Sequence, residues 1–157
     1  MNKITNKPKA PAKKLITISP PVKKTNGKRN RTAGHSFECS TVGALKAIGF
    51  EHACTSRSES RSRDDQKIDI INKDERKNGR LPYNIQCKNV VGTLKYAKVL
   101  SEMPDHGPEI NVVLHNQTKR SVSNFITVGQ YAFLKMEDFF QLVQQVENLK
   151  KQLGIKH

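Results

Sequence analysis

The sequence has few cysteines, and their number and spacing exclude two common ways of stabilising a small domain. Among 157 residues there are only three, Cys39, Cys54 and Cys87, an odd number without a CxxC pair. A disulfide framework needs an even set, and a structural zinc site usually needs closely spaced ligand pairs. Because apolar residues occur in the sequence near the cysteines, we expect buried free thiols.

Long apolar runs are also missing. No stretch approaches the roughly 20 apolar residues of a membrane-spanning helix. The run LITI at residues 15–18 is shorter than the about 7–15 apolar residues of a signal peptide. A transit peptide would favour Arg and Ser, whereas this leading segment is mostly Lys. We therefore expect a soluble, intracellular protein with no membrane partner.

Acidic residues are absent from the first 37 positions. The chain has 28 basic and 14 acidic residues, a net charge of +14, and the first 33 residues alone carry ten basic side chains and four of the seven prolines. Dense like charge with little apolar content predicts a disordered basic tail over residues 1–30 and a folded domain over residues 31–157. A polyanion is the expected partner of the tail. The alternative is a tail that only keeps the protein soluble.

The folded part alternates between helical and extended patterns. The spacing of Phe37, Thr41, Ala44, Leu45 and Ile48 predicts a helix with one apolar face, which Gly49 ends. The expected elements after it are a short strand at 51–56, a polar surface loop at 56–66, strands at 67–72 and 83–91 joined by a hairpin connection, a helix at 92–103, a central strand at 110–116, a final strand or strand pair within 124–135, and a helix at 136–154. This order predicts an α/β protein with a mixed central sheet flanked by helices, plus a C-terminal helix.

The C-terminal helix carries a narrow apolar seam. Phe139, Leu142, Val146, Leu149 and Leu153 follow one another in steps of three and four residues. Such a stripe commonly covers a sheet; the alternative is a role in dimerisation.

Polar residues interrupt the strand YNIQCKNVV at residues 83–91. Side chains two residues apart share a face of a strand, so Gln86 and Lys88 project together while Ile85 and Cys87 point to the core. A hairpin partner strand would bring Asp69 nearby. Carboxylate and amide oxygens are suitable ligands for Mg²⁺, and a lysine beside them can orient water or stabilise phosphate charge.

The segments RTAGHSFE, KIDIIN and QCK resemble the PD-(D/E)XK nuclease superfamily, and more narrowly its archaeal and phage Holliday junction resolvases. The resemblance covers roughly residues 29–145. It implies a restriction-endonuclease-like αβββαβ core and a homodimeric, Mg²⁺-dependent endonuclease of DNA recombination that cuts branched DNA, with Mn²⁺ as a substitute metal. Glu38, Asp69 and Gln86 would be metal-site residues and Lys88 the catalytic lysine. A phage-encoded protein of this kind would act in the cytoplasm of a prokaryotic host.

Gln86 departs from the family pattern, which has Glu or Asp at that position. It keeps a ligand oxygen but loses a charge, so we expect weaker Mg²⁺ binding. The alternative function is therefore a non-catalytic DNA-binding protein on a degenerate nuclease fold. Asp69 is preferred over Asp64 and Asp65 as the metal ligand because it lies within the alternating strand pattern.

Four arginines are candidate DNA contacts. Arg57, Arg61 and Arg63 alternate with serines in the polar loop and suit phosphate contacts that do not read sequence. Arg31 matches the leading arginine of the family. The alternative for the loop is a solvated, mobile surface segment.

Overall fold

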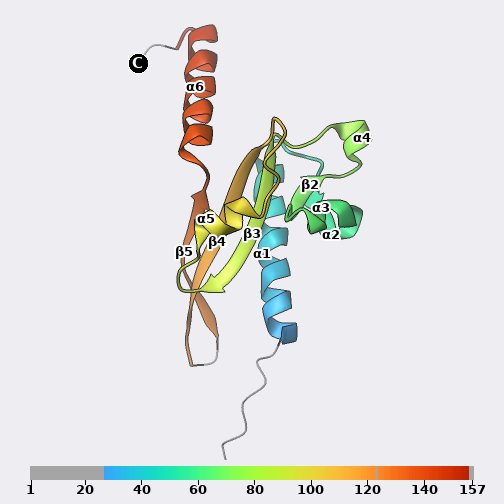
Figure 1. The fold of residues 1–157 in the computed structure, drawn as a ribbon, viewed down its shortest axis with the longest axis vertical. Coiled ribbons are helices and arrows are strands. Elements are labelled where there is room, and N and C mark those ends of the chain that lie inside the picture. Colours follow the sequence, from blue (N-terminus) through green and yellow to red (C-terminus); the bar gives the residue numbers. More distant parts are fainter. Residues whose placement is uncertain (1–26, 123, 156–157) are drawn as a thin grey trace, which may run out of the picture.

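The computed structural model describes residues 27–122 and 124–155, so most of the predicted basic tail lies outside the described residues. The first helix begins at Gly27 and thus includes four residues that the sequence analysis assigns to the tail. In chain order the elements are α1 (Gly27–Ala47), β1 (Ala53–Thr55), α2 (Ser56–Glu59), α3 (Arg61–Asp65), β2 (Ile70–Asn72), α4 (Glu75–Asn78), β3 (Tyr83–Val91), α5 (Tyr96–Ser101), β4 (Ile110–Arg120), β5 (Phe125–Phe133) and α6 (Met136–Gln152) (Figure 1).

The strands form one five-stranded sheet in the order β1-β2-β3-β4-β5. Only β3 and β4 run parallel; the other three neighbouring pairs are antiparallel. The crossover between the parallel strands contains α5, as parallel pairing requires a long connection. The predicted α/β class with a mixed sheet, flanking helices and a C-terminal helix is confirmed.

The two faces of the sheet have separate apolar cores. On one face, Ile70, Ile85 and Cys87 are buried together with Leu81, and Phe37 and neighbouring side chains of α1 pack against them. On the other face, Val113 of β4 is buried with Val99 and Met103, from α5 and the turn after it. The register pairs Gln86 with Val113 and Lys88 with His115, so these β3 residues share the face that α5 covers. The predicted alternation of β3 is therefore confirmed.

The end of α1 follows the predicted glycine stop. Gly49 has a φ of +106°, and the amides of Gly49 and Phe50 donate to the carbonyls of Lys46 and Leu45, as in a Schellman motif. Phe50 then packs against the core. The predicted apolar face was wrong at Ala44 and at Ile48, which follows the last residue of α1; both are exposed.

Two connections differ from the prediction. Residues 56–66 form two short helices rather than a polar loop, and the link between β2 and β3 contains α4, whereas β5 is the single final strand that was one of the two predicted alternatives. A bidentate ion pair helps to hold these short helices in place, because Arg63 of α3 donates to both carboxylate oxygens of Glu75 in α4 at 2.9–3.1 Å. Local sequence gives no sign of a contact between residues 12 positions apart.

A chain of partly buried amides links β5 to α1 across the sheet. Gln130 donates to Asn116 at 3.4 Å, Asn116 donates to Asn89 at 3.1 Å, and Asn89 donates to the carbonyl of Ala33 at 2.9 Å. Satisfied polar groups inside a core fix one arrangement of its elements, since a shifted helix would leave amides unpaired. This chain of bonds sets the position of α1 over β3.

Two other expectations fail. The thiol of Cys39 is exposed rather than buried, whereas that of Cys87 is buried. Helix α6 contains no buried residue and does not cover the sheet; it projects past its end (Figure 1). None of the helices within residues 27–122 and 124–155 is long and apolar enough to cross a membrane.

Candidate active site

Asp69 directly precedes β2, and its backbone is hydrogen-bonded to β3 on one side and to the start of α2 on the other. Its amide donates to the carbonyl of Ile85 at 2.8 Å, and its carbonyl accepts from the amide of Ser56 at 2.8 Å. Its carboxylate oxygen Oδ2 accepts from the backbone amide of Cys87 at 2.7 Å. Two hydrogen bonds to β3 and one to the start of α2 fix this residue, with its buried side chain next to β3.

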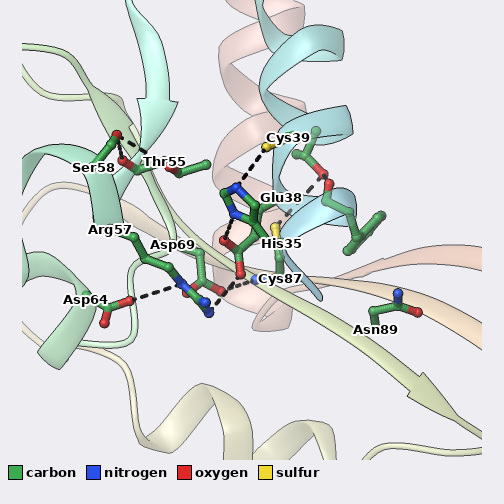
Figure 2. A network of polar contacts seen from close by, with 12 residues as sticks. His35, Glu38, Cys39, Thr55, Arg57, Ser58, Asp64, Asp69, Cys87 and Asn89 are labelled. Carbon is green, nitrogen blue, oxygen red and sulfur yellow. Dashed lines mark hydrogen bonds and ion pairs between the residues drawn. The ribbon is translucent and has the colours of Figure 1, made fainter. Parts of the chain in front are cut away.

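Glu38 reaches the same region from α1 and is only 3% exposed. Its Oε1 lies 3.0 Å from Nη2 of Arg57 in α2, and its Oε2 lies 3.5 Å from Nδ1 of His35, one turn earlier in α1. Arg57 also approaches Asp64, with 3.8 Å between Nε and Oδ1. Figure 2 shows the guanidinium of Arg57 between the carboxylates of Glu38 and Asp64, with Asp69 beside it.

The pKa of Asp69 reflects its burial and the charges around it. The pKa of this carboxyl is raised from 3.8 to about 6, mainly by burial and also by the negative charge of Glu38. The Cys87 amide and the positive charges of Lys88 and Arg57 lower the pKa, but they do not offset burial. Glu38, Asp69 and Lys88, which are far apart in the sequence, therefore lie within electrostatic reach of one another.

Cys87 adjoins the carboxylates but is not a metal ligand candidate. Burial, followed by the charge of Asp69, raises the pKa of its thiol to about 12. Metal ligation requires the thiolate. The thiol lies 3.9 Å from the Thr41 hydroxyl and belongs to the core beneath α1.

Gln86 is the predicted site residue that the structure joins least closely to the others. It is 1% exposed, and no hydrogen bond between it and Glu38 or Asp69 is present within the described residues. Its Oε1 is buried and lacks a hydrogen-bond partner in that part of the chain. A buried acceptor without a partner is uncommon in folded proteins and requires an explanation such as a water or an ion.

The donor set can be compared with what a divalent cation needs. Within residues 27–122 and 124–155, no group of three or more His, Cys, Asp and Glu side chains could hold a metal ion. Two carboxylates are nevertheless close together, and Gln86 supplies an unpartnered amide oxygen on the neighbouring strand. Oxygen donors alone suit Mg²⁺, which keeps several waters and needs few protein ligands. The residues offer a hard cation two carboxylates, one of them paired with Arg57, and one amide oxygen on the sheet face that α5 covers.

The four candidate DNA contacts divide into two kinds. Arg57 and Arg63 are held in ion pairs with acidic side chains. Arg31 and Arg61 are exposed and form no ion pair within the described residues. Arg31 and Arg61 are therefore free to contact a phosphate, whereas Arg57 and Arg63 would share their guanidinium groups between a phosphate and an acidic side chain.

Sequence reasoning missed the contacts around Glu38. His35 is half-exposed and lies 3.5 Å from the Glu38 carboxylate. Arg57, a candidate phosphate contact, pairs with Glu38 across 19 positions of sequence. The i,i+3 spacing of His35 and Glu38 on one helix is a local signal for their contact. The contact between Arg57 and Glu38 has no local signal in the sequence.

The comparisons with known proteins give no match: no family model, no curated protein and no solved structure is similar to this chain.

Proposed function

We propose that this protein is a Mg²⁺-dependent endonuclease that hydrolyses phosphodiester bonds in DNA. The observation that carries the proposal is the electrostatic contact of Asp69, directly before β2, with Glu38 of α1 and Lys88 of β3, with both carboxylates buried. Burying two like charges close together is unfavourable unless a cation compensates them. Strained charge arrangements of this kind concentrate at functional sites.

The order of elements supports a restriction-endonuclease-like core. Without the short helices, the chain runs α1, β1, β2, β3, α5, β4, which is the αβββαβ order implied by the resemblance to PD-(D/E)XK nucleases. The sheet is mixed, as such a core requires. The candidate residues lie on α1, directly before β2 and on β3, within the three matching motifs.

The chemistry is attack by water on phosphorus, with a new P–O bond formed and the bond to the leaving sugar oxygen broken. Glu38 and Asp69 would hold Mg²⁺, with Mn²⁺ as a substitute, and Gln86 would supply a third, neutral oxygen. When bound, the cation would lower the pKa of water and stabilise phosphate charge. Lys88 would donate to a phosphate oxygen or orient the attacking water, and the water proton would pass to solvent.

The charge distribution supports a nucleic-acid substrate. The net charge of +14 is concentrated in the first 33 residues, and Arg31 continues it onto the exposed surface of α1. Such a tail grips phosphates without sequence preference, and its affinity falls steeply with salt. Following the resemblance, we propose branched DNA as the substrate, a homodimer as the acting form and a phage Holliday junction resolvase as the specific role.

A second function is favoured by two specific observations. Gln86 removes one charge from the metal site, and Arg57 already neutralises Glu38. A non-catalytic DNA-binding protein on a degenerate nuclease fold would show both features. Incubating the protein with four-way junctions and with linear duplex, in Mg²⁺ or in EDTA, separates the two functions: the enzyme cuts only with Mg²⁺, and the binding protein binds the junction and cuts in neither.

Asp69→Asn should reduce junction cleavage at least 1,000-fold while junction binding stays within about threefold, since the change removes a ligand charge and keeps the side-chain shape. Cleavage is measured under single-turnover conditions and binding by gel shift in EDTA. Asp65→Asn, an exposed acid four residues away in α3, is the matched control and should behave as wild type. The opposite pattern would assign the metal to Asp65.

The pKa of Asp69 predicts how stability depends on pH without metal. Because this pKa is raised, the buried neutral acid stabilises the fold fully below pH 3.8, and this stabilisation is lost as pH rises through about 6. In EDTA, the free energy of unfolding of wild type relative to Asp69→Asn should fall by about 3 kcal/mol between pH 4 and pH 8. Urea titrations of both proteins across this range measure it; parallel curves would contradict the buried charge.

Gln86→Glu should restore the third charge. We expect cleavage at the same rate or faster, with half-maximal activity at an Mg²⁺ concentration about tenfold lower, because added ligand charge strengthens binding of a hard cation. Mg²⁺ titrations of cleavage measure this. Gln66→Glu, an exposed position outside the site, adds the same charge as a control. A complete loss of cleavage in Gln86→Glu would show that the site needs the neutral amide.

Arg57→Gln tests whether this guanidinium stands in for the cation at Glu38. Its loss leaves a buried carboxylate unpaired, so the melting temperature in EDTA should fall, and added Mg²⁺ should raise it more than in wild type. Thermal melts with and without Mg²⁺ measure both effects. Arg61→Gln, an exposed arginine four residues along the chain, is the control and should melt as wild type does. Equal Mg²⁺ shifts in all three proteins would rule out competition at Glu38.

A further inference from the structure

Helix α6 exposes more apolar surface than an isolated helix in water can sustain. Its 17 residues include none that is buried, and Phe139 and Leu149 are 50% and 56% exposed. Its other exposed apolar side chains, with two that follow the helix, are Met136, Phe140, Val143, Val146, Leu153 and Ile155. A helix of this length is only marginally stable alone, because its stability in proteins comes from packing one face. A large apolar patch on a soluble protein marks an interaction site.

The spacing of these residues identifies the kind of partner. Phe139, Leu142, Val146, Leu149 and Leu153 step by three and four, which is the pattern of a helix that packs along another helix. Met136 and Val143 flank this seam and widen it. The expected partner of α6 is therefore a second amphipathic helix.

The seam is complementary to itself when reversed. Phe139 and Leu153 each lie seven residues from Val146, and Leu142 and Leu149 lie four and three residues from it. A two-fold axis through Val146 thus places the apolar residues of one antiparallel helix opposite those of an identical helix. Isologous contacts of this type are the commonest in homodimers.

The charges of α6 select the same arrangement. Glu137 and Asp138 lie in its first turn, and Lys150 and Lys151 lie in its last. Antiparallel pairing brings acidic ends near basic ends and opposes the two helix dipoles, whereas parallel pairing brings like charges together. The helix has three acids and two lysines, so it lacks the cationic polar face that favours binding to an anionic membrane.

The neighbouring strand extends the same surface. β5 is the edge strand of the sheet and leads directly into α6. Ile126, Val128 and Tyr131 on it are exposed. Long edge strands with apolar side chains are normally covered, because they otherwise recruit other chains.

The geometry points to a dimer of this chain in which two α6 helices pair antiparallel about Val146, with β5 at the margin of the interface. This interface identifies the partner in the homodimer proposed above, but it rests on the apolar face of α6 and not on the metal chemistry. The dimer forms without DNA and without Mg²⁺.

Sedimentation equilibrium of the full chain tests the interface in EDTA and without DNA. Wild type should be dimeric at 10 μM, and Val146→Glu should weaken self-association at least 100-fold, because it places two like charges at the two-fold axis. Gln144→Glu adds the same charge on the opposite side of the same helix and should remain dimeric. Asp69→Asn should also remain dimeric, so a failed metal site and a failed interface give different results.

Cysteine pairs test the direction of the helices. In a Cys39→Ser background, Val146→Cys should form an intermolecular disulfide under mild oxidation. Glu137→Cys should not, since in the antiparallel pair its two copies are about 27 Å apart along the axis at 1.5 Å per residue. A wild-type monomer at 100 μM, a dimeric Val146→Glu protein, or efficient cross-linking through position 137 would each overturn the proposal. A thermal melt confirms that each variant keeps the folded sheet.

Discussion

The hydrogen bond from the Cys87 amide to the Asp69 carboxylate determines where the charged groups of this protein can lie. It holds the Asp69 side chain, which is 9% exposed, against β3 next to Lys88 in the same strand. The same peptide unit carries Cys87 into the core beneath α1. A displacement of β2 relative to β3 would thus break a buried charge contact and a core contact together, which makes the position of Asp69 costly to change.

Charge balance around Glu38 and Asp69 explains the rest of the neighbourhood. Two buried carboxylates need positive charge, and this chain supplies it from Arg57 on α2 and Lys88 on β3. Arg57 is 44% exposed, whereas Glu38 is 3% exposed. If a metal ion displaced Arg57, its charge would replace the one that now compensates Glu38. The neutral Gln86 keeps the total negative charge at a level that one arginine and one lysine can balance.

The sequence predicted the elements that carry strong periodicity and the residues that lie on them. The alternation of β3, the apolar face of α1 around Phe37 and the glycine stop at Gly49 are each set by local geometry, so local patterns identify them. The Arg57–Glu38 and Arg63–Glu75 pairs depend on how α2, α3 and α4 fold back, and no local pattern contains that information. Gln86 shows the same limit, since its face was predicted correctly but its missing partner is a property of the packed sheet.

The C-terminal helix was assigned correctly as a helix and wrongly as a cover for the sheet, and the reason bears on function. A helix that covers a sheet needs a connection that folds back, but β5 runs almost directly into α6, with two residues between them. The stripe with coiled-coil spacing therefore remains outside the core that α1 and α5 complete on their own. The apolar face of α6 is redundant for the monomer fold, and its symmetry about Val146 would be without consequence if the chain acted alone.

A dimer joined through α6 would carry two basic tails, and two linked weak contacts on one DNA molecule bind far more tightly than either does separately. In the proposed nuclease, non-specific binding by the tails and placement by the dimer would act together on a branched substrate, while the carboxylates would serve only the chemistry.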